Sequence, residues 1–344
     1  MRRVFIVGEQ RSGSNLLRLM LDQIPGLACP HPPHILQRMY PLLDRYGELS
    51  DDGSFLRLAK DVVELIRRNP VEWEGFEATG EVIAGRCRKR SLLSVYEQAM
   101  DEYALGCGSD LGWVCKSMQN IRWFREMEEH FQDPLYLYLY RDPRDVAVSF
   151  RKAVVGNKHP FLVAQKWAAL QKLCLNARSE VPSRFLSISY ESLIAEPRAA
   201  AMRICSFLGV AYTDLMLSYH RSREAERSSS ASSLWGNLSK PIMKGNAGKF
   251  RSEMTIEEVA LVEKASLEQM RALGYEAMHT EEELECLVVE SDSIRRFEEE
   301  DISIAKEVID KMDDADRRAR CRQSDWIEEI RARTIAASKV EIAV

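Results

Sequence analysis

The segment GEQRSGSN, residues 8–15, lies between an apolar run and an amphipathic run, which predicts a turn between a strand and a helix. Such a turn presents backbone N–H groups at the positive end of a helix dipole, where phosphate groups bind. Its glycine spacing matches a phosphate-binding loop, but Ser14 and Asn15 replace the lysine and hydroxyl residue that nucleotide triphosphatases need. With Arg11 inside the loop, the segment predicts a nucleotide without a γ-phosphate and without magnesium. A turn whose glycines serve only its backbone geometry is the alternative.

A second candidate anion site lies in RDPRDVAVS, residues 141–149, where another apolar run passes into a helical pattern. Arg141 would stand at the end of the strand and Ser149 two turns along the helix, so both could bind one phosphate. The alternative is that the two arginines of the segment merely pair with its two aspartates at the surface.

Two further segments could contact the same ligand. The loop IMKGNAGKF, residues 242–250, contains Lys244 and Gly245, and its glycines and lysines could surround an anion. Tyr190 follows another apolar run and could either contact a nucleotide or pack in the core. Each of these two signals is weak by itself.

The elements that would position these residues follow an alternating order of strand and helix, which predicts an α/β fold with a mainly parallel sheet flanked by helices. The expected strands are Val4–Val7, Trp113–Cys115, Leu135–Tyr140 and Phe185–Ile188. Helical periodicity follows the first, third and fourth of them, in residues 14–23, 145–153, 161–177 and 197–208. Residues 38–108 are mostly helical in pattern and predict an insertion that covers the edge of the sheet.

The C-terminal third begins with residues 222–239, which are rich in serine and arginine and predict a mobile loop. Thr255–Leu273 predicts a helix, because Thr255 and Glu258 form a capping-box pattern. Residues 281–344 are helical and highly charged. Five apolar side chains there could seat a helix against the body or a partner, and so support a homo-oligomer: Ile302, Ile304, Val308, Ile309 and Met312.

Composition and charge narrow the classes of protein. The chain has 344 residues, 45% of them hydrophobic, and contains neither an apolar run that could cross a bilayer nor a secretory signal, which favours a cytoplasmic location. Residues 281–344 carry 11 basic and 19 acidic side chains, a net charge of −8, whereas the other 280 residues carry 37 and 34, or +3. Neither value indicates a nucleic-acid-binding surface. Eight scattered cysteines predict reduced, mostly buried thiols, with no disulfide framework and no zinc site.

The four segments, taken in this order, resemble the PAPS-dependent sulfotransferase superfamily over about residues 3–275, and the Arg-Ser-Gly loop is similar to its bacterial and tyrosylprotein branches. The resemblance implies a P-loop-like domain over residues 1–278, followed by an acidic helical extension over 279–344. It implies 3′-phosphoadenosine 5′-phosphosulfate (PAPS) as the co-substrate, with no metal. The implied donor-binding residues are Arg11, Ser12, Gly13, Ser14 and Asn15 for the 5′-phosphosulfate, Arg141, Ser149, Lys244 and Gly245 for the 3′-phosphate, and Tyr190 for the adenine. Lys116 and Arg11 would support the transferred group.

The general base is where this chain departs from the resemblance. Cytosolic steroid and phenol sulfotransferases have a histidine at the position of Met118, and the other branches use an acidic residue just after the first helix. Here that stretch offers two histidines, of which we favour His34 and keep His31 as the other candidate, because a neutral imidazole suits deprotonation of a hydroxyl. Both could instead be turn residues held by neighbouring prolines, and Glu9 is a third candidate. Trp235 would take the place of the family's adenine-stacking tryptophan, which is Leu16 here.

The acceptor is expected to carry a hydroxyl group on a small molecule, carbohydrate, lipid or peptide. The main alternative is a protein of the same fold that binds a nucleotide or a partner without catalysis. A P-loop kinase is a second alternative, which the replacement of lysine by Ser14 disfavours.

Overall fold

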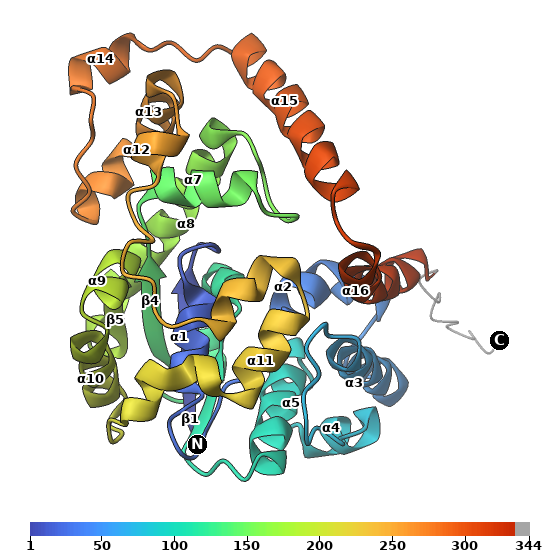
Figure 1. Cartoon of the computed structure of the whole chain (residues 1–344). Helices are drawn as coiled ribbons and strands as arrows, with labels where there is room; N and C mark the ends of the chain where they lie inside the picture. Colours follow the sequence, from blue (N-terminus) through green and yellow to red (C-terminus); the bar gives the residue numbers. More distant parts are fainter. Residues whose placement is uncertain (334–344) are drawn as a thin grey trace, which may run out of the picture.

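The computed structural model describes residues 1–333, apart from the side chains of residues 233, 234, 315, 319 and 320 (Figure 1). Its centre is a five-stranded parallel sheet with the strand order β2-β3-β1-β4-β5. The strands are β1 (Arg2–Gly8), β2 (Leu27–Ala28), β3 (Gly112–Cys115), β4 (Leu135–Tyr140) and β5 (Phe185–Ser189). The predicted α/β class and four strands are confirmed. Strand β2 was not predicted, because a strand of two residues leaves no periodic pattern.

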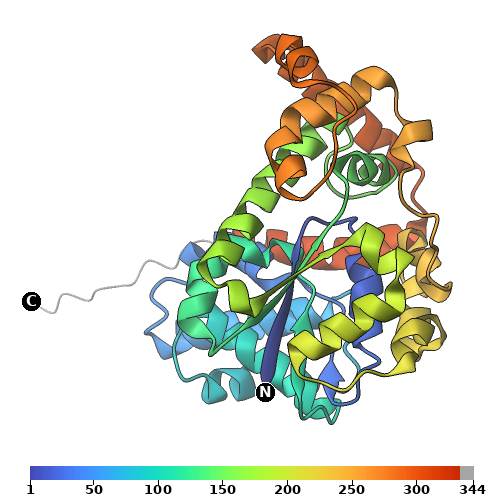
Figure 2. The same ribbon diagram turned by 90° about the vertical axis from the view of Figure 1, so that its left-hand side faces the viewer.

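Helices cover both faces of the sheet (Figure 2). Side chains alternate along β1, so that Phe5 and Val7 join the core on one face and Val4 and Ile6 the core on the other. The first face packs against α3 (Asp52–Arg67) and α5 (Leu92–Gly106), and the second against α1 (Ser14–Leu21) and α10 (Pro197–Leu208). The helical insertion therefore covers a face of the sheet, whereas we expected it at an edge.

A third core joins α7 (Pro143–Arg151), α8 (Pro160–Glu180) and α13 (Ile256–Ala272) above the sheet in Figure 1. The capping box of α13 is confirmed, since the side chain of Thr255 accepts from the Glu258 N–H and Glu258 accepts from the Thr255 N–H. The smaller helices are α2 (Ile35–Met39), α4 (Gly80–Arg86), α6 (Phe124–His130), α9 (Tyr190–Ala195) and α12 (Phe250–Glu253), with the 3₁₀ segments η1 (Tyr40–Arg45), η2 (Met118–Trp123) and η3 (Pro182–Arg184).

The prediction of a mobile loop at residues 222–239 was wrong, because this stretch is mostly helical. The 3₁₀ segment η4 (Asp214–Arg221) leads into α11 (Arg223–Ser230), which is followed by η5 (Ser233–Ser239). Arg18 of α1 explains the difference. Its fully buried guanidinium donates to Glu224 Oε1 at 2.7 Å and to Ser228 Oγ at 2.7 Å, which fixes α11 on the body. The helix depends on this tertiary contact, which no local pattern reveals.

The C-terminal extension, residues 281–333, forms α14 (Glu281–Cys286), α15 (Ser291–Asp310) and α16 (Asp314–Ala332). In Figure 1, α15 runs from the side of α13 and α14 toward α16, which lies beside α2 and α3. Ile327 and Ile330 of α16 are buried in the same core as α3. The extension is thus helical, as predicted, and contacts the body at both of its ends.

Two general properties follow from the described residues. No helix within residues 1–333 is both long and apolar enough to span a membrane. All eight cysteines are free thiols, but only four of them are buried, so the expectation of mostly buried thiols was half right.

Candidate active site

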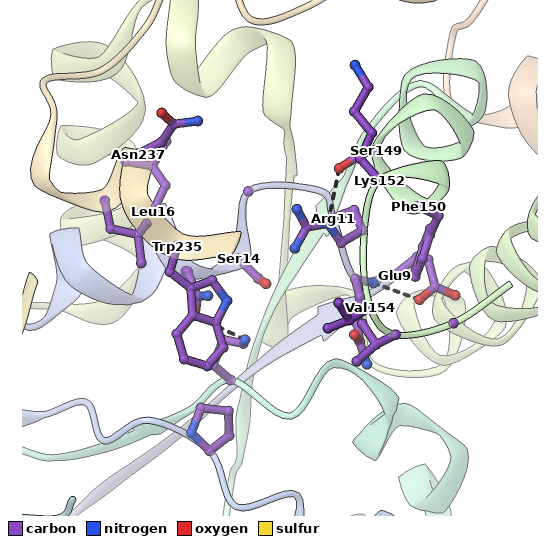
Figure 3. A pocket seen from close by; sticks show the side chains of 18 of the residues that line it. Glu9, Arg11, Ser14, Leu16, Ser149, Phe150, Lys152, Val154, Trp235 and Asn237 are labelled. Carbon is purple, nitrogen blue, oxygen red and sulfur yellow. Dashed lines mark hydrogen bonds between the residues drawn. The ribbon is translucent and has the colours of Figure 1, made fainter. Parts of the chain in front are cut away.

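A pocket of about 980 Å³ opens beyond the carboxyl ends of the parallel strands, where open α/β sheets bind ligands. Glu9 follows β1, Lys116 follows β3, Arg141 follows β4 and Tyr190 follows β5, and all four line it. In Figure 3, Trp235, Leu16 and Asn237 lie on one side of this pocket and Arg11, Ser149, Glu9 and Val154 on the other. Parallel pairing therefore brings together the segments that the sequence analysis singled out.

The loop between β1 and α1 has the backbone geometry of an anion-binding turn. Arg11 has a φ of 66° and Gly13 one of 87°. A Cβ atom on Gly13 would lie 2.4 Å from Cδ2 of Tyr190, so the absence of a side chain lets the loop pack on the tyrosine ring. No described side chain caps α1, which leaves the N–H groups of its first turn to bind an anion. Ser14 and Asn15 of that turn line the pocket.

Arg11 and Ser149 form a direct hydrogen bond, although the resemblance assigned them to opposite ends of the donor. The Nε of Arg11 donates to Ser149 Oγ at 3.0 Å, and both residues line the pocket (Figure 3). The two predicted phosphate sites are thus neighbours in space across 138 residues of sequence.

Arg141 connects three segments of the site. Its guanidinium donates to the carbonyl oxygen of Arg11 at 3.2 Å, to that of Asn246 at 2.8 Å and to Asp145 Oδ2 at 3.2 Å. It also lies 4.4 Å from the ring centre of Tyr190. Its Nε is buried and has no hydrogen-bond partner among the described residues. Arg141 is therefore held rigidly, and its described hydrogen bonds use three of its five N–H groups.

The alternative of surface pairing in this segment is half right, because the two arginines do pair with the two aspartates, but all four residues are buried. Arg144 is buried and bonds both Asp142 at 2.7 Å and Glu263 at 2.6 Å. Asp145 is buried and accepts from the N–H groups of residues 248 and 250. The hydrogen bonds of Asp145 tie α7 to the loop at 242–250, and the ion pair of Arg144 with Glu263 ties α7 to α13. Both position Arg141.

The loop at 242–250 reaches the pocket, but not through Lys244 and Gly245. Asn246 donates to the hydroxyl of Tyr190 at 2.6 Å and lines the pocket, as does Lys249. Lys244 and Gly245 are exposed and lie outside the described lining. The sequence indicated Lys249 only as one of the loop's two lysines and did not indicate Asn246, because the loop pattern contains several polar residues and gives no side-chain direction.

Lys116 is buried beside the loop of residues 9–13, as the resemblance implies. Its Nζ donates to Asn15 Oδ1 at 3.0 Å. Burial, together with the nearby charges of Arg18 and Arg11, lowers the pKa of Lys116 to about 7. A ligand that brings negative charge would restore the ammonium form. Ser12, by contrast, is fully buried outside the lining, and its Oγ has no partner among the described residues.

Both candidate histidines line the pocket. His34 begins α2 with a φ of 58°, and burial, with the charges of Lys116 and Arg38, lowers its pKa to about 3. The Nδ1 of His31 pairs with Asn69, and its ring lies 4.7 Å from that of Trp235. Burial keeps the pKa of His31 well below its usual value. Both imidazoles are therefore neutral at physiological pH.

Glu9 is the third ionisable candidate. It is 5% exposed, and one carboxylate oxygen accepts from the N–H of Gln10 at 2.7 Å. Burial raises the pKa of Glu9 to about 7, against the opposing charges of Arg122 and Lys166.

The pocket is strongly basic. Nine basic side chains line it against two carboxylates, Glu9 and Asp145, among the described residues. The basic residues are Arg11, Arg38, Lys116, Arg122, Arg141, Lys152, Lys166, Lys249 and Arg317. Within residues 1–333, no group of three or more His, Cys, Asp or Glu side chains is arranged to hold a metal ion. The geometry suits an organic polyanion.

Comparison with known proteins gives a family and a fold. The sequence model described as the sulfotransferase family matches residues 3–214. Protein-tyrosine sulfotransferase A of Caenorhabditis elegans is 23% identical over 228 residues, which make up 63% of this chain and 52% of the relative. The chain thus spans about half the length of that relative.

Two solved structures share the fold. The sulfotransferase domain from the curacin biosynthetic pathway has a TM-score of 0.59 and 24% identity, and the match covers 80% of this chain and 98% of that domain. The sulfotransferase domain of the Synechococcus PCC 7002 olefin synthase has a TM-score of 0.55 and 23% identity, with 80% and 95% covered.

Proposed function

The chain belongs to the sulfotransferase family, and on that premise we propose that it transfers a sulfuryl group from PAPS to a hydroxyl group of its acceptor. The observation that carries this proposal is the convergence of Arg11, Lys116 and Arg141 in one pocket, each after a different strand. Three fixed cations beside a helix N-terminus fit a donor with two separate phosphate groups.

The fit can be described group by group. The first turn of α1 and Arg11 would hold the 5′-phosphosulfate, as in the resemblance. Arg141 supports binding of the 3′-phosphate, because it lines the pocket and its described hydrogen bonds use three of its five N–H groups. The 3′-phosphate site would also include Ser149, which lies beside Arg11. Tyr190 and Trp235 are two of the aromatic residues in the lining and would contact the adenine. Lys244 and Gly245 would have to move toward the pocket to take the role that the resemblance implies.

The residues around the transferred group would act mainly by electrostatics. When the acceptor oxygen bonds to sulfur, the bond between sulfur and the bridging oxygen breaks, and negative charge builds on the departing phosphate. Lys116 and Arg11 would stabilise this charge from fixed positions in a site shielded from water. The anionic donor itself favours the charged form of Lys116.

A general base must take the proton of the acceptor hydroxyl. We assign this role to His34, with His31 as the second candidate, since both neutral rings line the pocket. The acceptor is a peptide, lipid, carbohydrate or small molecule with a free hydroxyl group. The name of the C. elegans relative adds a tyrosine residue of a protein to the acceptors worth testing.

Calorimetric titration with adenosine 3′,5′-bisphosphate and with 5′-AMP tests the donor site. We expect a preference for the bisphosphate of about 10- to 100-fold, which corresponds to one or two charge-assisted hydrogen bonds. Arg141→Ala should abolish the preference, and Arg141→Lys should restore part of it. Arg125→Ala is the matched control, because Arg125 is exposed and lies outside the lining. Equal binding of the two nucleotides by the wild-type protein would refute the proposal.

A transfer assay distinguishes an enzyme from a protein that only binds the nucleotide. The protein is incubated with [³⁵S]PAPS and, in turn, a phenol, an alkanol, a sugar and a tyrosine peptide, and labelled product is measured. Labelled product supports the enzyme. Tight binding of the bisphosphate without transfer to any acceptor supports the binding protein, and magnesium-dependent turnover of ATP supports a kinase.

A further inference from the structure

The C-terminal extension lines part of the pocket. Ile309 at the end of α15, Met312 in the following turn, and Arg317 and Cys321 of α16 all belong to the lining. These residues lie beyond the segment 3–214 that the family model matches. The helices α15 and α16 therefore form a wall of the pocket that lies outside the residues matching the family's sequence model.

The wall is fixed to the body on both sides of the α15–α16 turn. Asp301 of α15 accepts from the N–H groups of Lys158 at 2.5 Å and His159 at 2.8 Å. Gln323 of α16 donates to the carbonyl oxygen of Leu65 at 2.9 Å. Arg317 donates to the carbonyl oxygen of Ile309 at 3.0 Å, which holds the turn itself. The position of Ile309 and Met312 over the pocket is thus set by contacts on either side of them.

The side chains that the extension presents there are apolar and partly open to solvent. Ile309 is 41% exposed, and Met312 is half-buried. Across the lining, the loop after α7 contributes Val154, which is half-buried, and Val155, which is 36% exposed. We call these four residues the apolar rim. Exposed apolar side chains that gather around a cavity mark a ligand site more often than single ones do.

The apolar rim differs in chemistry from the donor groups. Lys116 and Arg141 are buried at the strand ends, with 8% and 6% exposure, and suit anions. Val154 lies beside Glu9, across the pocket from Trp235 in Figure 3. A nucleotide bisphosphate has no large apolar part that would need the rim, so the rim is available to the second substrate.

We propose that the extension forms one wall of the acceptor site, and that Ile309 and Met312, with Val154 and Val155, hold the apolar body of a hydroxylated acceptor. This inference rests on the proposed function. It selects, among hydroxyl acceptors, amphipathic molecules whose hydroxyl group enters the basic pocket while an alkyl or aryl part lies against the rim.

A series of 4-alkylphenols, from 4-methylphenol to 4-octylphenol, tests the inference by calorimetry on the protein saturated with adenosine 3′,5′-bisphosphate. Each added methylene that is buried should raise affinity by up to about fourfold. Ile309→Ser and Met312→Ser should each weaken 4-octylphenol binding by about tenfold and leave 4-methylphenol almost unchanged. Ile309→Leu should keep the wild-type increase. The control is Ile302→Ser, since Ile302 lies on the same helix, is 69% exposed and is outside the lining.

Two outcomes overturn the inference while the donor site stands: affinity that does not change along the series, or equal losses in Ile309→Ser and Ile302→Ser. Loss of bisphosphate binding in Ile309→Ser would overturn it as well, because the residue would then support the donor site. Failure of the wild-type protein to prefer the bisphosphate over 5′-AMP would instead refute the proposed function.

Discussion

Arg11 joins the two predicted phosphate sites through its bond to Ser149, and Arg141 bonds the carbonyl oxygen of the same arginine. The cationic groups of the site are therefore positioned by one another and by the backbone before any ligand binds. Such preorganisation lowers the cost of ordering charged side chains when an anion arrives. It also explains why Arg141, although buried, keeps a defined direction.

The pH dependence of turnover distinguishes the candidate bases. The pKa of His34 is about 3 and that of Glu9 about 7, and a bound anionic donor raises both. If His34 is the base, kcat/KM for the acceptor stays level as the pH falls from 7 toward 5, because the imidazole stays neutral. If Glu9 is the base, kcat/KM for the acceptor falls about tenfold for each pH unit below the pKa of Glu9. The bound donor raises the pKa of Lys116 above 7, so loss of its charge should lower the rate only at higher pH, and Lys116→Arg should move that decline to still higher pH.

The assay uses whichever acceptor of the panel reacts fastest. His34→Ala should lower turnover by about 10²- to 10⁴-fold and leave bisphosphate affinity unchanged. An acid decline near pH 7 that disappears in Glu9→Gln, with a mild effect of His34→Ala, would transfer the role to Glu9.

At this scale, the sequence predicts residue types better than contacts. Most of the predicted site residues line one pocket, since they follow strands or begin helices at one edge of a parallel sheet, and Ser149 reaches it from the last turn of α7. The predicted residues in the lining are Arg11, Gly13, Ser14, Asn15, Lys116, Arg141, Ser149, Tyr190 and both histidines. Ser12, Lys244 and Gly245 do not, because side-chain direction within a loop depends on tertiary packing. The hydrogen bond between Asn69, which follows α3, and His31 joins the helical insertion to the site, and no spacing in the sequence indicates this contact.

The element that most constrains the site is the turn between β1 and α1. Its Gly13 has a positive φ and packs against Tyr190, which itself begins α9. The turn was predictable because glycine spacing and hydrophobic pattern agree there. Helix α11 was not, because it depends on Arg18, which lies more than 200 residues away in sequence.

Gly13→Ala tests that turn. The new Cβ atom would force Tyr190 to move and would sit at a φ that alanine adopts with strain, so we expect a loss of about 1–3 kcal/mol in the free energy of unfolding. Bisphosphate affinity should fall as well, since both the loop and the Tyr190 ring shift. Urea denaturation and calorimetry measure the two effects.

The matched control is Gly85→Ala. Gly85 is exposed within α4 and has no heavy atom within 4 Å of an added Cβ, among those the structure describes. The free energy of unfolding should rise by up to about 1 kcal/mol there, because alanine favours a helix. Unchanged stability and binding in Gly13→Ala would show that the turn tolerates a side chain.

At the scale of the whole molecule, a weakly basic body carries an acidic extension that reaches back to the pocket. The sequence predicted the helical and acidic character of residues 279–344 but assigned them no role in the site, since charge runs do not show where a helix docks. The boundary after residue 278, the cytoplasmic location and a homo-oligomer through the C-terminal helices stay predictions. Residues 334–344 lie outside the described part of the chain.

Hydrogen exchange followed by mass spectrometry tests how the extension is held. None of the residues of α15 is buried, and a helix of this kind is marginal without packing. Helix α15 contacts the body through Phe297, whose ring stacks 4.1 Å from that of His159, and through Asp301, which accepts from the His159 N–H. Helix α16 instead buries Ile327 and Ile330, and Trp326 donates to the carbonyl oxygen of Asp61 at 3.2 Å. We therefore expect fast exchange in α15 and slow exchange in α16, in step with α3.

Asp301→Ala should release α15 further, because two backbone N–H groups lose their acceptor, while α16 keeps its protection. The matched control is Asp292→Ala, an exposed acidic residue near the start of the same helix. Release of α15 should also weaken binding of 4-octylphenol, since Ile309 and Met312 lie at the end of that helix. If α15 and α16 exchange at the same rate as each other and faster than α3, the extension is a separately unfolding unit. The wall of the acceptor site would then be formed by a segment that opens as a whole.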